Sequence, residues 1–298
     1  MTTIEPAGVV VLDKPEGLTS HDVVARMRRA LGIRRVGHAG TLDPFATGVL
    51  VLGFGAGTRL LPYLQATDKE YAATIRLGWP TTTDDRSGTP LRDPVAVTIG
   101  PEQVDDALRT LTGTIQQRPS AVSAIKVDGR RSYKRVRAGE DVELQARSVT
   151  VGRLERVGDI RFRADGSADL DVLVECSTGT YVRALARDAG ATLGCGGHLS
   201  QLRRTRVGPF GLDLAAEVPD RGGQVPPMLP LGQVAASVLP TIVMGADDAF
   251  RTRHGQRLPV TGDGGDGPTA ILDVHGGLVA VAQPREGHWR LLVVFAES

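Results

Sequence analysis

Hydrophobic and polar positions along this chain predict strands of two kinds. Residues 8–13 and 49–54 are almost unbroken apolar runs, which is typical of strands buried on both faces. In 71–77 and 169–176, large apolar side chains alternate with polar or small ones. Each of these two segments is therefore predicted to be a strand with one solvated face. Residues 198–207 predict a further strand.

Three other segments have apolar residues at helical spacing. The first begins at Ser20, its predicted N-cap, and ends at Gly32. The second begins at Pro101, since proline is favoured in the first turn of a helix. The third covers residues 180–193. This mixed order of strands and helices predicts an α+β fold, with a large mixed or antiparallel sheet and flanking helices, rather than regular βαβ units.

Proline and glycine mark the connections. A Pro- and Gly-rich segment near 219–240 predicts a boundary between a domain over residues 1–228 and a smaller one over 229–298. In the smaller part, TAILDVHGGLVAVAQ predicts two strands around a Gly-Gly turn, and LLVVF predicts another, as in a small β-barrel. TTTDDRSGTP, from Thr81, predicts an exposed loop, and residues 117–140 predict a protruding basic segment.

Composition narrows the class of protein. The chain has 298 residues, of which 41% are hydrophobic and 23% charged, as in ordinary soluble globular proteins. It has no apolar run of 18 residues, and MTTIEPAG lacks the regions of a signal peptide. Only two cysteines occur, Cys176 and Cys195, which does not favour a disulfide framework. We therefore expect a cytoplasmic protein with no membrane partner.

The net charge of +1 hides an uneven distribution. Arg26 to Arg35 contains five basic and no acidic residues, and Arg118 to Arg137 contains seven basic residues and one acidic residue. Arg203, Arg204 and Arg206 form a third cluster. Such clusters can follow a phosphate backbone while acidic residues elsewhere balance the total. Taken singly, each cluster is better explained as a solvated surface than as a binding site.

The loop with the clearest chemical content lies within Gly37 to Gly53. It presents the carboxylate of Asp43, followed by Pro44, which restricts the backbone of both residues. Gly40 and Gly48 permit tight turns on either side. Asp-Pro also opens ordinary turns, so the spacing alone leaves a structural and a catalytic interpretation open.

Five segments, taken in order along the chain, favour the catalytic interpretation of Asp43, because together they resemble the TruB-type tRNA pseudouridine synthases. GHAGTLDPFATG resembles the catalytic motif of this family, and VVVLDKPEGLTSHDVV resembles its N-terminal motif. DKEYAATIRLG, CSTGTYVRALARDAG and HLSQLRRTRVG resemble three further motifs. The resemblance covers roughly residues 8 to 210. One departure is Val122, where many members have tyrosine.

The resemblance implies roles for particular residues. Asp43 is implied to be the essential catalytic carboxylate, acting at C1′ of the target nucleotide, with Arg183 as the cation that keeps it ionised. Tyr71 is implied to stack on the flipped uracil and to act in proton removal from C5. Tyr181 is implied to line the same pocket.

Three more side chains complete the implied site. His38 is implied to fill the space that the flipped base leaves, and Leu202 to form an apolar wall of the uracil pocket. Lys14 is implied to support the loop of Asp43. Without the motifs, His38 would be interpreted as a surface histidine, Leu202 as a core leucine and Lys14 as a solvated lysine.

The implied reaction is isomerisation of uridine 55 in the T-loop of tRNA to pseudouridine, with the base flipped out. No redox change or energy source is involved, so no cofactor is expected, and no metal. The resemblance further implies an RNA-clamping insertion over about 117–145 and a C-terminal RNA-binding PUA domain, and we expect a monomer. Two alternatives remain: a non-catalytic RNA-binding or tRNA-folding protein, and a synthase that acts on rRNA.

Three other short motifs do not predict a binding site. GFGAGT lacks the last glycine of GxGxxG and the lysine of a P-loop. Cys195 and His198 have the spacing of half a zinc site without a second pair, and Asp84 with Asp85 alone does not define a metal site.

Overall fold

The computed structural model describes residues 6–120, 126–127, 130–131, 145–220, 223–260 and 265–296. The chain divides into two compact units. The first unit consists of Met1–Pro44, Gly48–Thr67 and Val207–Ser298, and the second consists of Phe45–Thr47 and Asp68–Arg206. Val122 and most of the predicted 117–145 insertion lie outside the described residues. No helix in the described part of the chain has both the length and the apolar character needed to cross a membrane.

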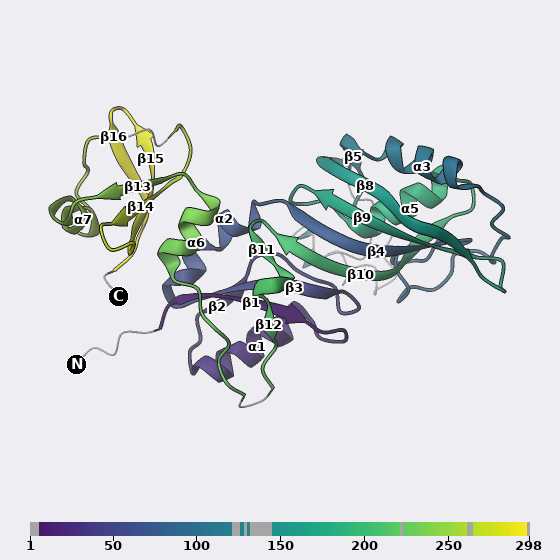
Figure 1. The fold of residues 1–298 in the computed structure, drawn as a ribbon, viewed down its shortest axis with the longest axis horizontal. Helices are drawn as coiled ribbons and strands as arrows, with labels where there is room; N and C mark the ends of the chain where they lie inside the picture. The colour runs from purple at the N-terminus through teal and green to yellow at the C-terminus, as the bar shows by residue number, and fades with distance from the viewer. Residues whose placement is uncertain are drawn as a thin grey trace. The chain divides into compact units, whose positions relative to one another are not determined.

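The first unit begins with a small sheet built on the predicted apolar strands (Figure 1). Its strands are β1 (Gly8–Lys14), β2 (Val36–His38), β3 (Thr47–Phe54) and β12 (Ala216–Glu217). β1 and β3 pair antiparallel, and β12 runs parallel to β1. β2 pairs antiparallel with the last three residues of β3, Leu52 to Phe54. Both faces of β1 and β3 are buried, which explains the absence of alternation in these two segments.

Helix α1 (Ser20–Leu31) packs beside this sheet and ends, as predicted, at Gly32, whose φ of 68° lies in the left-handed region. The predicted N-cap is wrong by one residue. Thr19 is the cap, because its hydroxyl accepts a hydrogen bond from the backbone N–H of Asp22 and the Asp22 carboxylate accepts one from Thr19 N–H. Ser20 is thereby left for a tertiary contact.

The remaining elements of this unit are shorter. They are the 3₁₀ helices η1 (Gly55–Leu60) and η2 (Leu212–Leu214), the helices α2 (Leu61–Gln65), α6 (Leu231–Val238) and α7 (Ala246–Arg253), and the strands β11 (Phe210–Gly211), β13 (Thr241–Met244), β14 (Thr269–Asp273), β15 (Leu278–Arg285) and β16 (His288–Val294). A shared core joins the two ends of the chain: Val9 and Val51 pack in one cluster with Val234 and Val281.

The C-terminal strands form a four-stranded sheet in the order β13-β14-β15-β16. The predicted hairpin around the Gly-Gly turn is present as β14 and β15, and the predicted last strand is β16. Within the described residues β13 and β16 are edge strands, so the sheet is open and the expected PUA-like barrel is not confirmed. The predicted boundary at residues 228 and 229 stays a prediction.

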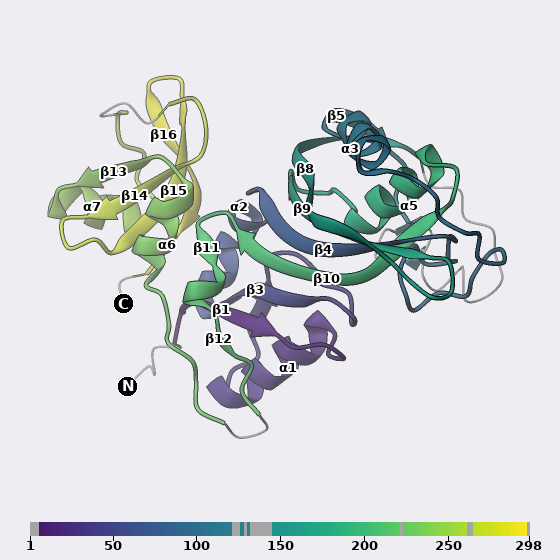
Figure 2. The same cartoon turned by 45° about the vertical axis from the view of Figure 1, so that its right-hand side comes forward.

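The second unit is a larger antiparallel sheet with helices on one face (Figure 2). Its order is β10-β4-β9-β8-β5, with β10 (Gly197–Val207), β4 (Lys69–Leu77), β9 (Ala168–Cys176), β8 (Arg147–Phe162) and β5 (Gly113–Gln117). The helices are α3 (Pro101–Thr110) and α5 (Val182–Thr192). Two further short strands, β6 (Lys126–Val127) and β7 (Arg130–Arg131), pair with each other. The mixed α+β class is confirmed.

The predicted solvated faces of β4 and β9 are covered by ion pairs. Lys69 to Leu77 pairs antiparallel with Ala168 to Cys176, which sets Arg76 opposite Asp169. Arg76 contacts Asp169 through two hydrogen bonds of 2.8 and 3.0 Å. Asp169 is therefore only 8% exposed, although the alternation alone predicted a wet position.

Gly190 sets how closely α5 approaches the start of β10. Its carbonyl accepts a hydrogen bond from Gly196 N–H at 2.8 Å, and a Cβ at residue 190 would overlap backbone atoms of Gly196 and Gly197. We expect Gly190→Ala to lower the free energy of unfolding by about 1–3 kcal/mol, because backbone cannot move aside as a side chain can. Denaturant unfolding measures this loss. Gly152→Ala is the control, since its Cβ would meet nothing closer than 3.7 Å, and an equal loss there would contradict the prediction.

Candidate functional site

The loop that carries Asp43 connects β2 to β3 in the first unit, and the Asp43 side chain is partly exposed. Gly40 and Gly48 have φ values of 110° and 100°, which side chains other than glycine rarely adopt. Leu42, just before Asp43, is 3% exposed and anchors the loop in the core. The carboxylate is thus presented from a rigid loop, as the sequence predicts.

Lys14 anchors this loop through hydrogen bonds of its side chain. It is the last residue of β1 and is fully buried. Its ammonium donates to the carbonyl oxygens of Pro15 at 2.9 Å, Leu18 at 2.6 Å and Pro44 at 3.4 Å. The interpretation of Lys14 as a solvated lysine is therefore wrong, while its implied support of the loop agrees with these contacts. A buried ammonium is tolerated here because backbone carbonyls replace the water that it loses.

The start of α1 supplies a second brace. Ser20 Oγ accepts a hydrogen bond from Leu42 N–H at 2.9 Å and donates to Leu42 O at 3.2 Å, and Ser20 is 1% exposed. Gly17 N–H donates to Pro44 O at 2.8 Å. The two residues that flank Asp43 are therefore both tied to residues 14–20. The sequence predicted a helix cap at Ser20 and missed this contact, because it joins segments that are 22 residues apart.

His38 lies at the end of β2 in the same unit, partly exposed. Its ring meets the ring of His21 edge to face, with centroids 5.7 Å apart. His21 is exposed in the first turn of α1. Two histidine rings thus lie side by side in the unit that carries Asp43, and only one of them was singled out from the sequence.

The other predicted site residues lie in the second unit. Tyr71 on β4 is 9% exposed, and Leu202 on β10 is 8% exposed. Tyr181 precedes α5 as its N-cap residue and is partly exposed. Gln117 was not predicted, yet its side-chain amide bonds both backbone groups of Tyr181: Tyr181 N–H donates to Oε1 at 2.8 Å, and Nε2 donates to Tyr181 O at 3.1 Å. This pair of bonds fixes the start of α5.

Arg183 is in the first turn of α5 and is 5% exposed. Its guanidinium donates to Thr83 O at 2.9 Å and lies 3.6 Å from the Asp85 carboxylate. The sequence predicted Asp43 as the partner of Arg183. Within the second unit the carboxylate beside Arg183 is Asp85, and the pair of Arg183 with Asp43 stays a prediction.

Asp85 belongs to the segment that was predicted to be an exposed loop, and that prediction is wrong for its centre. Asp84 and Asp85 are 8% and 4% exposed. Backbone hydrogen bonds bind this segment to Leu199 of β10: Leu199 N–H donates to Asp84 O and Arg86 N–H donates to Leu199 O. The loop becomes buried because it adds its backbone to the end of a strand.

Asp84 and Asp85 form ion pairs with different arginines. Asp84 pairs with Arg187 at 3.1 Å, whereas Asp85 also accepts hydrogen bonds from Thr83 Oγ1 at 2.7 Å and Ser87 N–H at 2.8 Å. Burial raises the pKa of Asp84, and the Arg187 guanidinium opposes that shift. Neither aspartate joins a metal set: in the part of the chain that the structure describes, no three His, Cys, Asp or Glu side chains gather as ligands.

Lys69 adds positive charge two residues before Tyr71. It is 5% exposed, and burial together with the nearby Arg204 lowers its pKa to about 8. Arg204 itself is 1% exposed. The sequence placed Arg204 in a basic cluster that either follows a phosphate backbone or is solvated, and it did not predict that Arg204 is buried. It did not single out Lys69, because nothing in the alternation of β4 shows that this end of the strand is enclosed.

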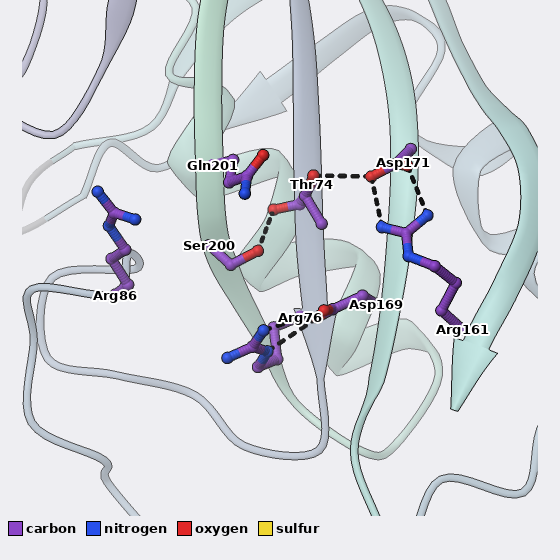
Figure 3. A pocket seen from close by; sticks show the side chains of 8 residues that line it. All are labelled: Thr74, Arg76, Arg86, Arg161, Asp169, Asp171, Ser200 and Gln201. Carbon is purple, nitrogen blue, oxygen red and sulfur yellow. Dashed lines mark hydrogen bonds and ion pairs between the residues drawn. The ribbon is translucent and has the colours of Figure 1, made fainter. Parts of the chain in front are cut away.

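A polar pocket of about 240 Å³ opens on the face of this sheet where Thr74 and Arg76 lie (Figure 3). Two of its three arginines are neutralised by aspartates. Arg76 is bonded to Asp169, and Arg161 donates to both oxygens of Asp171 at 2.5 and 2.8 Å. Seven of its eight lining residues come from β4, β8, β9 and β10, and Arg86 comes from the loop that begins at Thr81. Because the strand arginines already bond aspartates, we interpret the pocket as a place where ion pairs stabilise the sheet rather than as a ligand site.

Three family models match the chain: TruB family pseudouridylate synthase (N terminal domain) over residues 28–182, tRNA pseudouridylate synthase B C-terminal domain over 183–219, and tRNA Pseudouridine synthase II, C terminal, over 239–296. A tRNA pseudouridine synthase B of Thermobifida fusca (strain YX) is 50% identical, over 98% of this chain and 99% of that protein. One from Arthrobacter sp. (strain FB24) is 48% identical, over 98% and 97%.

A solved structure of similar fold is the crystal structure of a Cbf5-Nop10-Gar1 complex. The similarity has a TM-score of 0.71 at 25% identity and covers 98% of this chain and 84% of the chain in that complex. The likeness therefore extends through both units of the chain, beyond the segments that carry the five motifs.

The buried ion pair of Arg183 with Asp85 should stabilise the second unit. We expect Asp85→Asn to cost about 3 kcal/mol of unfolding free energy, because the buried Arg183 guanidinium would lose the Asp85 carboxylate that lies 3.6 Å away. Asp84→Asn is the matched variant in the same loop. It should cost only about 1 kcal/mol, since Arg187 is more exposed and also contacts Asp188. Denaturant unfolding compares the two, and equal losses would count against a special role of Asp85.

Proposed function

The chain belongs to the TruB family of pseudouridylate synthases, and on that premise we propose that it converts uridine 55 in the T-loop of tRNA to pseudouridine. The observation that carries this proposal is the near full-length similarity to tRNA pseudouridine synthases B, combined with the braced loop that presents Asp43. A protein that only binds RNA has no need for a carboxylate held in this way among basic segments.

The reaction moves one glycosidic bond. The N1–C1′ bond of the target uridine breaks, the uracil turns, and a C5–C1′ bond forms, after which the proton on C5 leaves to N1 or solvent. In our proposal Asp43 acts at the sugar, either as a nucleophile on C1′ or by managing the charge or a proton there. The rigid loop serves this step because the oxygen atoms must be positioned before the bond breaks.

The target base must leave the stacked RNA loop before Asp43 can reach C1′. Tyr71 is proposed as the aromatic surface on which the flipped uracil stacks, an interaction worth about 1–3 kcal/mol, and as a participant in proton removal from C5. Tyr181 and Leu202 are proposed to line the same pocket. His38 is proposed to occupy the space that the base leaves in the RNA.

Arg183 is proposed to favour the ionised form of Asp43 when RNA is bound, with Asp85 as the carboxylate that holds the guanidinium in place. The contacts of Arg183 with Thr83 and Asp85 fix its direction without RNA. Arg183 therefore needs little rearrangement to meet the substrate.

The T-arm of tRNA is proposed as the recognised element, the protein as a monomer, and the cytoplasm as its location. The C-terminal sheet is proposed to be a shortened relative of the PUA barrel. No cofactor is required by the bond changes above.

Asp43→Ala should abolish turnover while RNA binding stays within about threefold of wild type. The carboxylate acts on the reacting atoms, so kcat should fall by more than about 10³-fold. Mapping of pseudouridine in unmodified tRNA measures this, with Asp43→Asn as the isosteric variant. Near-normal activity of Asp43→Ala would disprove the assignment. If the wild-type chain modified rRNA in place of tRNA, the alternative of a synthase that acts on rRNA would be favoured. If it modified neither RNA, the alternative of a non-catalytic RNA-binding protein would be favoured.

Tyr71→Phe separates stacking from hydroxyl chemistry. The ring and its stacking surface remain, so KM should change by less than about twofold, while loss of the proton-transfer group should lower kcat by about 10²-fold. Single-turnover kinetics with saturating enzyme isolates the chemical step. Tyr63→Phe on α2 is the control for removal of a half-buried tyrosine hydroxyl. Equal rates for Tyr71→Phe and wild type would eliminate the hydroxyl role.

A further inference from the structure

Tyr181 is held from two sides by strands β5 and β8 of the second unit. β5 ends at Gln117 and β8 begins at Arg147, and these two residues lie opposite each other in the antiparallel pairing. Gln117 bonds the backbone of Tyr181, while the guanidinium carbon of Arg147 lies 5.7 Å from the centre of the Tyr181 ring. The two strand ends therefore meet at one tyrosine, which lies 64 residues beyond Gln117 in the chain.

The Gln117 side chain bonds Tyr181 as a neighbouring strand would. Tyr181 lies between the end of β9 and the start of α5, and its φ of −103° and ψ of 105° are extended. In an antiparallel pair, an extended residue offers its N–H and its C=O to the same partner. The primary amide of glutamine carries an acceptor and a donor side by side, so it makes both bonds, of 2.8 and 3.1 Å.

Burial makes this contact specific for one position of Tyr181. Gln117 is 1% exposed, and a buried amide is costly unless its oxygen and its nitrogen are both bonded. Tyr181 O also accepts a hydrogen bond from Leu185 N–H at 3.2 Å, in the first turn of α5. Gln117 thus joins the end of β5 to the start of α5, and a shift of Tyr181 would leave a buried amide without partners.

The residues before Tyr181 are fixed to the same sheet. Ser177 N–H donates to Thr150 O at 2.8 Å, and Thr150 N–H donates to Ser177 Oγ at 3.0 Å. Thr150 lies on β8, close to Arg147 at the start of that strand. The backbone that leads to Tyr181 is therefore held by β8, and Tyr181 itself is held by β5.

Arg147 contacts the ring of Tyr181 rather than its backbone. A guanidinium within about 6 Å of an aromatic centre is attracted to the face of the ring, and Arg147 meets this distance. Different side chains thus hold the backbone and the ring. Together they restrict the direction of the Tyr181 ring in the protein without RNA.

We propose that Gln117 is a positioning residue for the isomerisation and that it acts through Tyr181, whose ring Arg147 helps to orient. The inference rests on the proposed function, in which Tyr181 lines the pocket of the flipped uracil. In that reaction the uracil must turn until C5 instead of N1 faces C1′, and a displaced wall permits orientations from which the new bond cannot form. Gln117 itself touches neither the substrate nor the reacting atoms.

Gln117→Met tests the proposal, because methionine keeps the length of the side chain and removes both polar atoms. Single-turnover pseudouridine formation at saturating enzyme should slow by about 10–100-fold, as expected for a small misplacement beside the reacting atoms. The Kd for unmodified tRNA should change by less than about threefold, since Gln117 makes no substrate contact that contributes to binding.

Two controls separate positioning from other effects. Gln116→Met changes the exposed neighbour on the same strand, and its rate constant should stay within about twofold of wild type. Val104→Ala truncates a fully buried residue of α3, so it lowers the free energy of unfolding. At a temperature where thermal unfolding shows every variant to be folded, its rate constant should also stay within about twofold of wild type.

A double-mutant comparison shows whether Gln117 acts through the ring. Tyr181→Ala removes the ring, so adding Gln117→Met to that variant should slow the reaction by less than about twofold. Arg147→Met is a second variant, in which a half-buried side chain is changed and the amide contact is kept. Alone it should slow the reaction by about 3–10-fold, and in the Tyr181→Ala variant by less than about twofold.

Amide hydrogen exchange at Tyr181 gives a readout that needs no RNA. Gln117→Met should speed the exchange of Tyr181 N–H by at least about tenfold, because Oε1 of Gln117 no longer accepts its hydrogen bond. Gln116→Met should leave this exchange rate unchanged.

A wild-type rate constant in Gln117→Met, or unchanged exchange of Tyr181 N–H, would overturn the proposal. So would a loss of rate in Val104→Ala as large as in Gln117→Met, or a full effect of Gln117→Met in the Tyr181→Ala variant. Absence of pseudouridine formation by the wild-type chain would instead contradict the proposed function, and the role of Gln117 in the reaction would then fail with it. An active wild-type chain with an equally active Gln117→Met variant would overturn the role of Gln117 alone.

Discussion

The burial of one ammonium group is the constraint on which the rest of the site depends. Lys14 sits at the end of β1 with no exposed surface and donates to three carbonyl oxygens, one of them on Pro44. These acceptors stabilise the charge in place of the water that it loses on burial. The loop of Asp43 and the segment before α1 are therefore held in one arrangement, and the bonds between Ser20 and Leu42 close it from the other side.

The second unit uses the same principle with a carboxylate. Arg183 is buried, and the loop of Asp84 and Asp85 supplies it with an aspartate and a carbonyl. That loop can reach α5 because it hydrogen-bonds to Leu199 on β10. In both units the polar groups of the proposed site are fixed by backbone atoms of neighbouring segments, which costs less conformational entropy than a network of long side chains.

Arginine has two separate uses in this molecule. On the sheet of the second unit, Arg76 and Arg161 bond aspartates on the neighbouring strand and stabilise the strand pairing. At the C-terminal sheet, Arg290 of β16 and Arg257 of the segment after α7 line a cavity without such partners in the described structure. Composition cannot separate these uses, because an almost neutral chain contains both. The separation depends on which charges share a sheet face.

The sequence by itself determined several of the elements and the motif that carries Asp43. Apolar runs and alternation are local properties, so β1, β3, β4, β9 and the C-terminal hairpin follow from them, and Gly32 ends its helix for a local steric reason. Only the tertiary structure decided which polar groups meet. Asp85 beside Arg183, Ser20 on Leu42, and the buried state of Lys14 and Asp169 join segments far apart in the chain. Burial and pairing are properties of the packed molecule, and a pattern of neighbouring residues does not contain them.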